Sequence, residues 1–529
     1  MRKYVGLLVL LIGLVSIGLA QAVNVPTYHN NNLRNGWNFA ETVLTPTNVN
    51  ASTFGLLHTV AVDGQVDAQP LVVASETIGG ISHQVVYVAT SNNTVYAIDG
   101  VSGAILLQRN LGPQVPSPSS CKPTPTLGGI LSTPTLSIGA QRIYVMDYTL
   151  INNVATHRLH ALSLSTLQDV VTPATVRASD TLANGSTTQF NATWHRQRPA
   201  LLQANGVIYA AFGDACKNDF PANLVRGWLL GWNANTLAPL ASNELTNSLA
   251  SNPGNYFLTS IWMSGYGPAA DALNNIYFVT GNSDPHQDTY NGTSSIQESA
   301  VKVPPNLSTV SDLFTPSNVF TLDQHDLDFG SGGIMVLPDQ PGPITHLATA
   351  AGKDGRMWIL NRDDMGGFQT TDVPPFINIG RCFCGQSYYN NRVVTSGGVN
   401  NSSGQSITRV STYRINTNLV TPLTLEASSA YMVPTKQQPG TFTSVSSNGN
   451  SNPIIWTVAR PTGTDNHLTL YAFNGTASSG TLATLWSGTA GFWNDMTQTA
   501  FTVATVANGY VYVGSYKMLD IFGLKQKKT

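Results

Sequence analysis

The chain has 529 residues, of which 42% are hydrophobic and only 10% charged, and its formal net charge is −2. Gly, Ser, Thr and Asn take many of the places that Lys and Glu usually fill, which favours β structure with many turns over helices. The net charge is small and no basic stripe is present. The sequence therefore argues against nucleic acid as a partner.

The N-terminus has the pattern of a secretory signal. Arg2 and Lys3 precede an apolar run from Tyr4 to Leu19, and Ala20-Gln21-Ala22 follows the A-x-A pattern of a cleavage site. The run is short for a membrane anchor, no Cys follows it for lipid attachment, and no later segment is apolar enough to cross a bilayer. We therefore expect cleavage near Ala22 and a mature protein that is secreted or periplasmic.

A polar, Asn-rich leading segment (residues 23–52) precedes an isolated strand, Thr53–Asp63. Val85–Leu111 then reads as strand, turn, strand, turn, strand. Such a unit buries both of its faces only when copies of it lie on either side. Eight units of this kind follow one another: Gln69–Leu111, Gly129–Leu167, Arg198–Leu237, Ile261–Val303, Gly330–Asp363, Ser387–Thr417, Asn452–Thr476 and Phe501–Leu524.

The last unit supplies three strands before a basic C-terminal tail (residues 525–529). The isolated strand Thr53–Asp63 would supply the fourth, and this pairing would close a ring without an open edge. We therefore predict an all-β, eight-bladed β-propeller over residues 53–524. Two stacked β-sandwiches are the alternative, but they need a Pro/Gly linker near the middle, and none stands out. The longer inserts between strands are expected to build a site on one rim.

The turn Ala97-Ile98-Asp99-Gly100-Val101-Ser102-Gly103 resembles the repeat of the quinoproteins, the pyrroloquinoline quinone dehydrogenases. In that repeat, Ala-x-Asp-x-x-Thr-Gly precedes a Trp that docks neighbouring blades. Here Ser102 replaces the Thr, and Leu107 stands where the Trp would be. The other copies, at residues 161–165 and 231–235, are more degenerate, so the chain resembles a divergent member with a quinoprotein alcohol dehydrogenase-like propeller.

The resemblance extends to the positions that form the site. In the quinoprotein alcohol dehydrogenases, the fourth blade opens with a Trp on which the quinone stacks and ends in a Thr-Gly-Asn that binds the metal. Trp262 and Asn282 stand at similar spacing. The family's catalytic Asp aligns with Asp326, paired with Asp328, or with Asp328 alone, and the resemblance implies that both also bind the metal. Lys353 matches the cation beside the quinone.

The implied function is an oxidoreductase that uses pyrroloquinoline quinone and Ca²⁺ or a lanthanide to oxidise an alcohol or a sugar. A flat anionic quinone suits a Trp face and a Lys, and an Asp takes the alcohol proton as hydride moves to the quinone. We expect Trp262, Asn282, Asp326, Asp328 and Lys353 to converge on one mouth of the channel. No haem motif is present, so the electrons would need a separate acceptor.

Two further residues are predicted near the mouth. Arg198 is placed to line the channel, where it would suit an anionic ligand, and Trp493 is placed to cover the quinone. The family's metal-binding Glu falls on Ala222, with Asp214 or Asp219 as candidate replacements. The missing Glu favours a second hypothesis, a propeller that has lost the cofactor and binds a protein, a glycan or an envelope component. A third hypothesis is a glycan hydrolase that uses Asp326 and Asp328 as paired carboxylates.

Four cysteines in an oxidising compartment favour one or two disulfides. The family's adjacent-cysteine disulfide above the quinone is missing, and Cys121, which lies roughly in its region, is paired with Cys216 as the candidate disulfide. Cys382 and Cys384 are too close in sequence for an easy local disulfide. A disulfide, a redox or metal role, and two buried free thiols all stay open for them.

Overall fold

The computed structural model describes residues 22–116, 127–181, 187–214, 227–240, 260–282, 296–496 and 498–526. The predicted signal peptide up to Gln21, both members of the proposed Cys121–Cys216 disulfide, and the positions Asp219 and Ala222 lie outside the described residues. In the part of the chain that is described, no helix is long and apolar enough to span a membrane.

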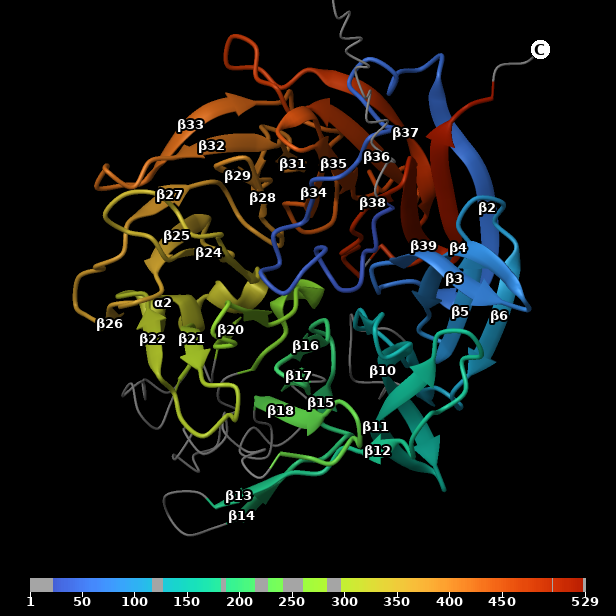
Figure 1. Ribbon diagram of the computed structural model, residues 1–529. Coiled ribbons are helices and arrows are strands. Elements are labelled where there is room, and N and C mark those ends of the chain that lie inside the picture. The colour runs from blue at the N-terminus through green and yellow to red at the C-terminus, as the bar shows by residue number, and fades with distance from the viewer. Residues whose placement is uncertain are drawn as a thin grey trace, which may run out of the picture.

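The described strands form eight sheets arranged as blades around a central axis (Figure 1). The first four blades are β3 (Leu71–Ile78), β4 (Ile81–Ala89), β5 (Thr94–Asp99) and β6 (Ile105–Asn110); β9 (Thr135–Ser137), β10 (Arg142–Ile151), β11 (Val154–Ser163) and β12 (Ala174–Thr175); β15 (His195–Arg196), β16 (Leu202–Ala204), β17 (Val207–Asp214) and β18 (Trp228–Asn233); and β19 (Ala269–Ala270), β20 (Ile276–Val279), β21 (Ala300–Val303), β22 (Asp312–Thr315) and β26 (Gly367–Phe368).

The other four blades complete the ring. They are β23 (Ile334–Val336), β24 (Leu347–Ala351), β25 (Arg356–Asn361) and β27 (Phe376–Asn378); β28 (Ser387–Tyr389), β29 (Arg392–Thr395), β32 (Ser411–Ile415) and β33 (Leu423–Ser428); β34 (Thr443–Asn448), β35 (Ser451–Ala459), β36 (His467–Asn474), β37 (Thr484–Phe492) and β1 (Trp37–Asn38); and β2 (Phe54–Gln65), β38 (Thr505–Ala507) and β39 (Tyr510–Leu524).

Short two-stranded sheets, a helix and 3₁₀ turns lie in the connections between these strands. They are β7 (Val115–Pro116) with β8 (Leu127–Gly128), β13 (Ser179–Thr181) with β14 (Thr187–Gln189), β30 (Gly398–Asn400) with β31 (Ser406–Thr408), helix α2 (Val319–Gln324), and the 3₁₀ turns η2 (Met263–Gly265) and η3 (Phe329–Ser331).

The ring closes as the sequence predicts. Strand β2 pairs antiparallel with β39, so that Phe54 lies opposite Leu524. Gly523 lies against Gly509 and the Tyr510 ring, so β39 folds back on itself around Lys517, whose φ is +57°. The hairpin and β38 therefore supply three strands of the last blade, and the N-terminal strand β2 supplies the fourth. This confirms the predicted eight-bladed propeller and its closure.

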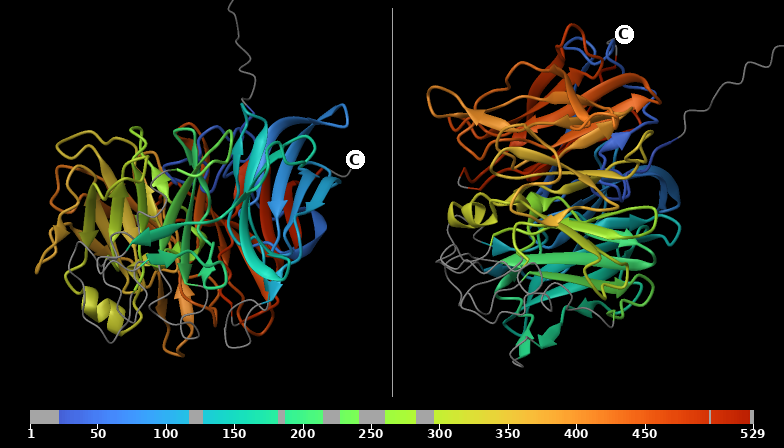
Figure 2. Two further views of the ribbon diagram at one scale, coloured as in Figure 1. Left: turned by 90° about the horizontal axis from the view of Figure 1, so that it is seen from below. Right: turned by 90° about the vertical axis from the view of Figure 1, so that its left-hand side faces the viewer.

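Antiparallel pairing decides which connections share an end of the ring. Successive strands of a blade run in opposite directions, so the turn between the second and third strands opens at the same end as the connection to the next blade. We call this end the front face (the side views of Figure 2 show strands running between the two ends). The predicted site residues all lie on these two kinds of connection.

The leading segment is not a peripheral loop. Residues 25–38 cross the middle of the ring (dark blue in Figure 1) and hydrogen-bond to the inner part of every blade. Backbone groups make most of these contacts, and side chains of the segment make the rest: Val25 with Val72, Pro26 with Leu136, Arg34 with Leu201, Asn32 with Ala270, Leu33 with Val336, Asn35 with Tyr388, Gly36 with Val445, and Asn38 with Val506. We call residues 25–38 the plug.

Neighbouring blades are also joined by tyrosines. Each such tyrosine donates its hydroxyl hydrogen to a backbone carbonyl of the next blade, and all but Tyr389, which ends the first strand of its blade, lie on the second strand. The pairs are Tyr87 to Leu164 (2.8 Å), Tyr144 to Ala234 (2.8 Å), Tyr209 to Pro305 (2.6 Å), Tyr389 to Gly475, and Tyr512 to Gly100 (3.0 Å). These bonds tie blades together where the family's docking Trp is missing.

Candidate functional site

Five of the predicted site residues come from blades four and five and their front-face connections. Trp262 immediately precedes η2 at the start of blade four, and Asn282 follows β20 of the same blade. Asp326 and Asp328 lie on the connection between α2 and β23, and Lys353 lies in the turn between β24 and β25. The contacts below confirm the expectation that these five residues converge.

The ammonium group of Lys353 is the centre of the cluster. Its Nζ lies 3.0 Å from Oδ1 of Asp326 and contacts Oδ2 of Asp328. Asn282 links the same two carboxylates, because its side-chain amide donates to Asp326 (3.2 Å) and its backbone N–H donates to Asp328 (2.9 Å). Burial acts to lower the pKa of Lys353, but Asp328 and Asp326 outweigh it, and the pKa is raised above its usual value. Lys353 therefore stays positively charged.

The two aspartates differ in exposure. The side chain of Asp328 is 4% exposed, whereas that of Asp326 is 56% exposed. Asp326 follows the end of α2 with φ +54°, the left-handed conformation that often ends a helix and that Asp tolerates better than most residues. Asp328 therefore holds Lys353 from the buried side, and Asp326 presents its carboxylate at the surface.

Glycine positions explain how the segments approach one another so closely. A Cβ at Gly281, the middle residue of the Thr-Gly-Asn motif, would lie 2.9 Å from Oδ1 of Asp328 and 3.1 Å from Nε1 of Trp262. A Cβ at Gly330 would lie 2.7 Å from the backbone nitrogen of Gly281. Side chains at these positions would push the aspartate connection away from Trp262 and Asn282.

An aromatic residue that the sequence analysis missed faces Trp262. Nζ of Lys353 lies 5.6 Å from the ring centre of Trp262 and 5.4 Å from that of Phe383, within the range of cation–π attraction. The two rings are 6.3 Å apart and inclined at 55°. Phe383 is fixed by its neighbours, because Cys382 and Cys384 form a disulfide in the buried core. The disulfide is therefore the correct reading of this Cys pair.

Two arginines add positive charge next to Phe383. Arg460 donates to the backbone carbonyl of Phe383 (2.5 Å), and its guanidinium lies 5.3 Å from the ring centre of Phe501. Arg198 stacks on the same ring at 4.2 Å. Burial lowers the pKa of Arg198 to about 10 and that of Arg460 to about 9, so both stay protonated at neutral pH. The predicted channel-lining residue Arg198 therefore shares the Phe501 ring with Arg460, which the sequence analysis missed.

Trp493 does not join this cluster, and this corrects the expectation that it covers the mouth. Its side chain is buried in the core that includes Trp456 and Phe522. Its indole N–H donates to the backbone carbonyl of Gln498 (2.9 Å). The connection between β37 and β38 turns this ring inward, so its face is not offered to a ligand.

Glu298 is a second missed residue. It is fully buried, Oε2 accepts the backbone N–H of Phe329 (2.6 Å), and Oε1 has no partner among the described residues. Burial and the charges of Asp328 and Asp323 raise its pKa well above the usual range. The hydrogen bond from the N–H of Phe329 and the charge of Lys353 act to lower the pKa, but they are the smaller effects. Glu298 is therefore a neutral acid directly behind the Lys353 cluster. The only sequence signal was a lone Glu in the same insert as Asn282.

The arrangement fits a flat anion better than a metal ion. The three predicted metal ligands, Asn282, Asp326 and Asp328, surround an ammonium group, and Asn282 turns its N–H₂ toward Asp326. No group of three or more His, Cys, Asp or Glu side chains within the described ranges is placed to hold a metal. A partly exposed Trp face next to Lys353, with Arg198 and Arg460 nearby, has the chemistry that a planar anion needs.

Comparison with known proteins supports the fold. No protein-family description and no curated protein matches the chain. The quinohemoprotein alcohol dehydrogenase from Comamonas testosteroni is similar in structure, with a TM-score of 0.62 and 14% identity over 96% of this chain and 81% of that one. A quinohemoprotein alcohol dehydrogenase from Pseudomonas putida HK5 has a TM-score of 0.59 and 13% identity over 96% of this chain and 81% of that one. A europium-containing methanol dehydrogenase has a TM-score of 0.58 and 12% identity over 95% of this chain and 98% of that one. These likenesses confirm the predicted quinoprotein-like propeller fold.

Proposed function

We propose that this protein is a quinoprotein-type oxidoreductase that oxidises an alcohol or a sugar with pyrroloquinoline quinone at the front face. The observation that carries the proposal is the position of Lys353, beside the Trp262 face and in contact with both Asp326 and Asp328. The fold shared with two alcohol dehydrogenases and a methanol dehydrogenase supports it. The signal-like N-terminus supports action outside the cytoplasm.

The cofactor would lie against Trp262, within reach of the Lys353 charge, and Arg198 and Arg460 would favour its carboxylates. When bound, the quinone supplies a two-electron, hydride-accepting centre. We assign no metal to the site, since the ammonium group of Lys353 already contacts both carboxylates that a metal would need. A Ca²⁺ or lanthanide requirement therefore does not follow from this arrangement.

The chain itself provides the acid–base chemistry. Asp326 is the exposed carboxylate of the pair, so it is the group that can accept the proton of a substrate hydroxyl. Lys353 and Asn282 both donate hydrogen bonds to its Oδ1 and so orient the carboxylate. Asp328 holds Lys353 in place and is too buried to meet the substrate directly.

A propeller that binds a ligand without turnover is the second candidate. The observation that favours it is the same ion pair, because both carboxylates are already engaged by Lys353. In that case Trp262 and the cations would bind a protein, glycan or small anion and no base would be needed. Turnover separates the two candidates.

The test is to add pyrroloquinoline quinone to the purified mature protein, alone and with Ca²⁺ or La³⁺. The melting temperature and the reduction of an electron-accepting dye are then measured with ethanol, glycerol and glucose. Binding to the native state alone should raise the melting temperature through linkage. We expect a rise with the quinone and without added metal, followed by dye reduction with at least one substrate.

Variants locate the effect. Trp262→Ala and Lys353→Ala should remove the rise, and Asp326→Asn should keep the rise but lose turnover. Lys302→Ala is the control, because Lys302 is a half-buried lysine on β21 of blade four that donates to the backbone of Arg362, away from this cluster. A rise without turnover in the wild type would favour the binding propeller. No rise under any condition would remove the quinone from the proposal.

A further inference from the structure

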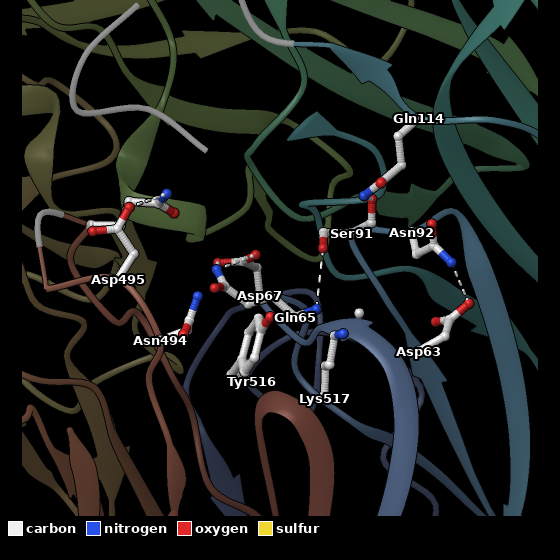
Figure 3. Close-up of a pocket in the computed structure, with 12 residues that line it drawn as sticks. Asp63, Gln65, Asp67, Ser91, Asn92, Gln114, Asn494, Asp495, Tyr516 and Lys517 are labelled. Carbon is white, nitrogen blue, oxygen red and sulfur yellow. Dashed lines mark hydrogen bonds between the residues drawn. The ribbon is translucent and has the colours of Figure 1, made fainter. Parts of the chain in front are cut away.

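A separate polar cavity opens on the front face where the ring closes. Its volume is about 450 Å³, and its lining residues include Gln65, Ser91, Asn92, Asp495 and Tyr516 (Figure 3). They belong to the end of β2, the β4–β5 turn, the β37–β38 connection and the tip of the β39 hairpin. None of the five clustered site residues described above lines it, so it is a second place at which a ligand can be held.

An irregularity in the closing strand pair shapes this cavity. Ala61 pairs with Met518, but the next pair is Gln65 with Tyr516, so three residues of β2 face Lys517 alone. Bulges of this kind bend a strand and redirect its side chains, and they are frequent next to functional sites. Gly64 lies in the bulge, and a Cβ there would be 2.9 Å from the backbone nitrogen of Asn92. The bulge therefore lies directly against the β4–β5 turn and directs Asp63 toward it.

The polar side chains of the cavity are held in place before any ligand binds. Each of its three carboxylates accepts a hydrogen bond from an amide side chain. The pairs are Asn92 to Asp63 (2.6 Å), Gln65 to Asp67 (3.1 and 3.0 Å) and Gln498 to Asp495 (3.0 Å). Figure 3 shows Asp67 and Gln65 at the centre, with Asp495 on one side and Asp63 on the other. Groups fixed in this way lose little freedom on binding.

The lining chemistry selects the class of ligand. Carboxylates only accept hydrogen bonds, the ammonium of Lys517 only donates, and amides and the Tyr516 hydroxyl do both. The lining carries three carboxylates and one ammonium, and the charges of Arg198 and Arg196 also act on Asp67, so the cavity offers an anion no excess of positive charge. The described residues contain no metal-holding group of His, Cys, Asp or Glu. Hydroxyl groups, which donate and accept at once, match this mixture. We propose that the cavity binds a neutral polyhydroxylated ligand, a sugar or sugar-alcohol unit.

The sugar proposal stands apart from the quinone proposal, because different residues carry it. It holds even if the Trp262 cluster binds no quinone.

The experiment is isothermal titration of the purified mature protein with maltotriose, cellobiose and sorbitol, with no quinone present. We expect at least one of them to bind. Losing one carboxylate or amide contact should weaken that binding roughly tenfold, the effect expected for a hydrogen bond to a charged or well-placed group. Asp67→Asn and Asn494→Ala test this directly. Asn494 is exposed on a surface connection, so its variant should fold even if the Asp67 variant does not.

Asp339→Asn is the matched control, because Asp339 is an exposed carboxylate in a cleft lined by other residues. Binding that is weakened by Asn494→Ala and unchanged by Asp339→Asn supports the proposal. Spermidine and Ca²⁺ serve as the competing ligands. Absence of binding by all three neutral compounds, binding that ignores Asn494→Ala, or binding of spermidine or Ca²⁺ alone would each overturn it.

Discussion

Glu298 shows how a single buried side chain can support the proposed site without contacting a substrate. It lies behind Asp328, with its pKa raised first by burial and then by the charges of Asp328 and Asp323. An ionised Glu298 would add a third carboxylate to Asp326 and Asp328, and the single charge of Lys353 could not balance all three. A neutral Glu298 avoids this and still accepts the backbone N–H of Phe329, which fixes the start of η3.

Glu298→Gln should therefore leave stability nearly unchanged at acidic pH, below the usual carboxyl pKa of 4.5, whereas Glu298→Ala should lower the free energy of unfolding by about 2–4 kcal/mol through a cavity and an unpaired N–H. A raised native pKa gives stability that is complete below the usual value of 4.5 and is lost as the pH rises through the native pKa. The difference between the Gln variant and the wild type should thus grow in favour of Gln as the pH rises. Urea unfolding at several pH values measures this.

Glu426→Gln is the matched control with the opposite sign. Glu426 accepts hydrogen bonds from Arg392 and Arg414, and although burial acts to raise its pKa, these arginines lower it. The stability that ionised Glu426 contributes is present above the usual carboxyl pKa and is lost in acid. Glu426→Gln should therefore lower the free energy of unfolding by about 1 kcal/mol at neutral pH. If Glu298→Gln costs more than Glu426→Gln at neutral pH, Glu298 is ionised and its assigned role is wrong.

Tyrosine hydroxyls join several pairs of neighbouring blades. Tyr144 and Tyr209 are each fully buried and each donates to a carbonyl of the following blade. The ring fills the interface, and the hydroxyl fixes the distance between blades. Their sequence context, Ile-Tyr-Val and Ile-Tyr-Ala, repeats on other second strands and was visible before the structure.

Tyr144→Phe and Tyr209→Phe should each lower the free energy of unfolding by about 1 kcal/mol, because each removes a hydroxyl that donates to a backbone carbonyl of the next blade. The two effects should add in the double variant, since the bonds lie at different blade interfaces. Tyr431→Phe, at a tyrosine that is 50% exposed, is the control and should change nothing. Urea midpoints with an unchanged slope would support this, and a double variant no worse than either single variant would contradict it.

Regular periodicity is what made the fold predictable from the sequence. β-Branched residues between turn residues predict strands such as Val85–Thr90. The number of such strands predicts eight blades and the closing strand. The connections lack such a period, so the direction of a side chain there depends on the loop path. That is why Trp493 was expected at the mouth but packs in the core, and why Phe383 and Arg460 were not foreseen.

At the scale of the whole molecule, the plug changes how the ring is held together. A propeller of single sheets is joined by contacts between neighbours, but residues 25–38 bond to all eight blades at once. Their polar, Asn-rich composition looked like a solvated loop, because polarity alone does not say whether hydrogen bonds go to water or to strands. Here the strands take them, and the plug acts as a common centre.

Arg34 is the residue on which that centre depends most. Its guanidinium is fully buried and donates to the carbonyls of Pro268 (2.9 Å), Leu201 (2.9 Å) and Tyr28 (3.0 Å), and to the Thr27 hydroxyl (2.7 Å). It thus joins blades three and four to the plug. Burial lowers its pKa to about 10, so it remains charged at neutral pH.

Arg34→Met should lower the free energy of unfolding by on the order of 3–5 kcal/mol, because four buried acceptors lose a charged donor together. Arg34→Lys should recover only part of this loss, since one ammonium group cannot reproduce the planar fork that reaches both blades. The control is Arg142→Met, at a partly exposed arginine that donates to the carbonyls of Ala234 (3.2 Å) and Asn235 (3.1 Å). Water can replace that arginine, so the control should cost about 1 kcal/mol or less. If Arg34→Met and Arg142→Met lower the free energy of unfolding equally in urea, the plug does not hold the blades together and this prediction is wrong.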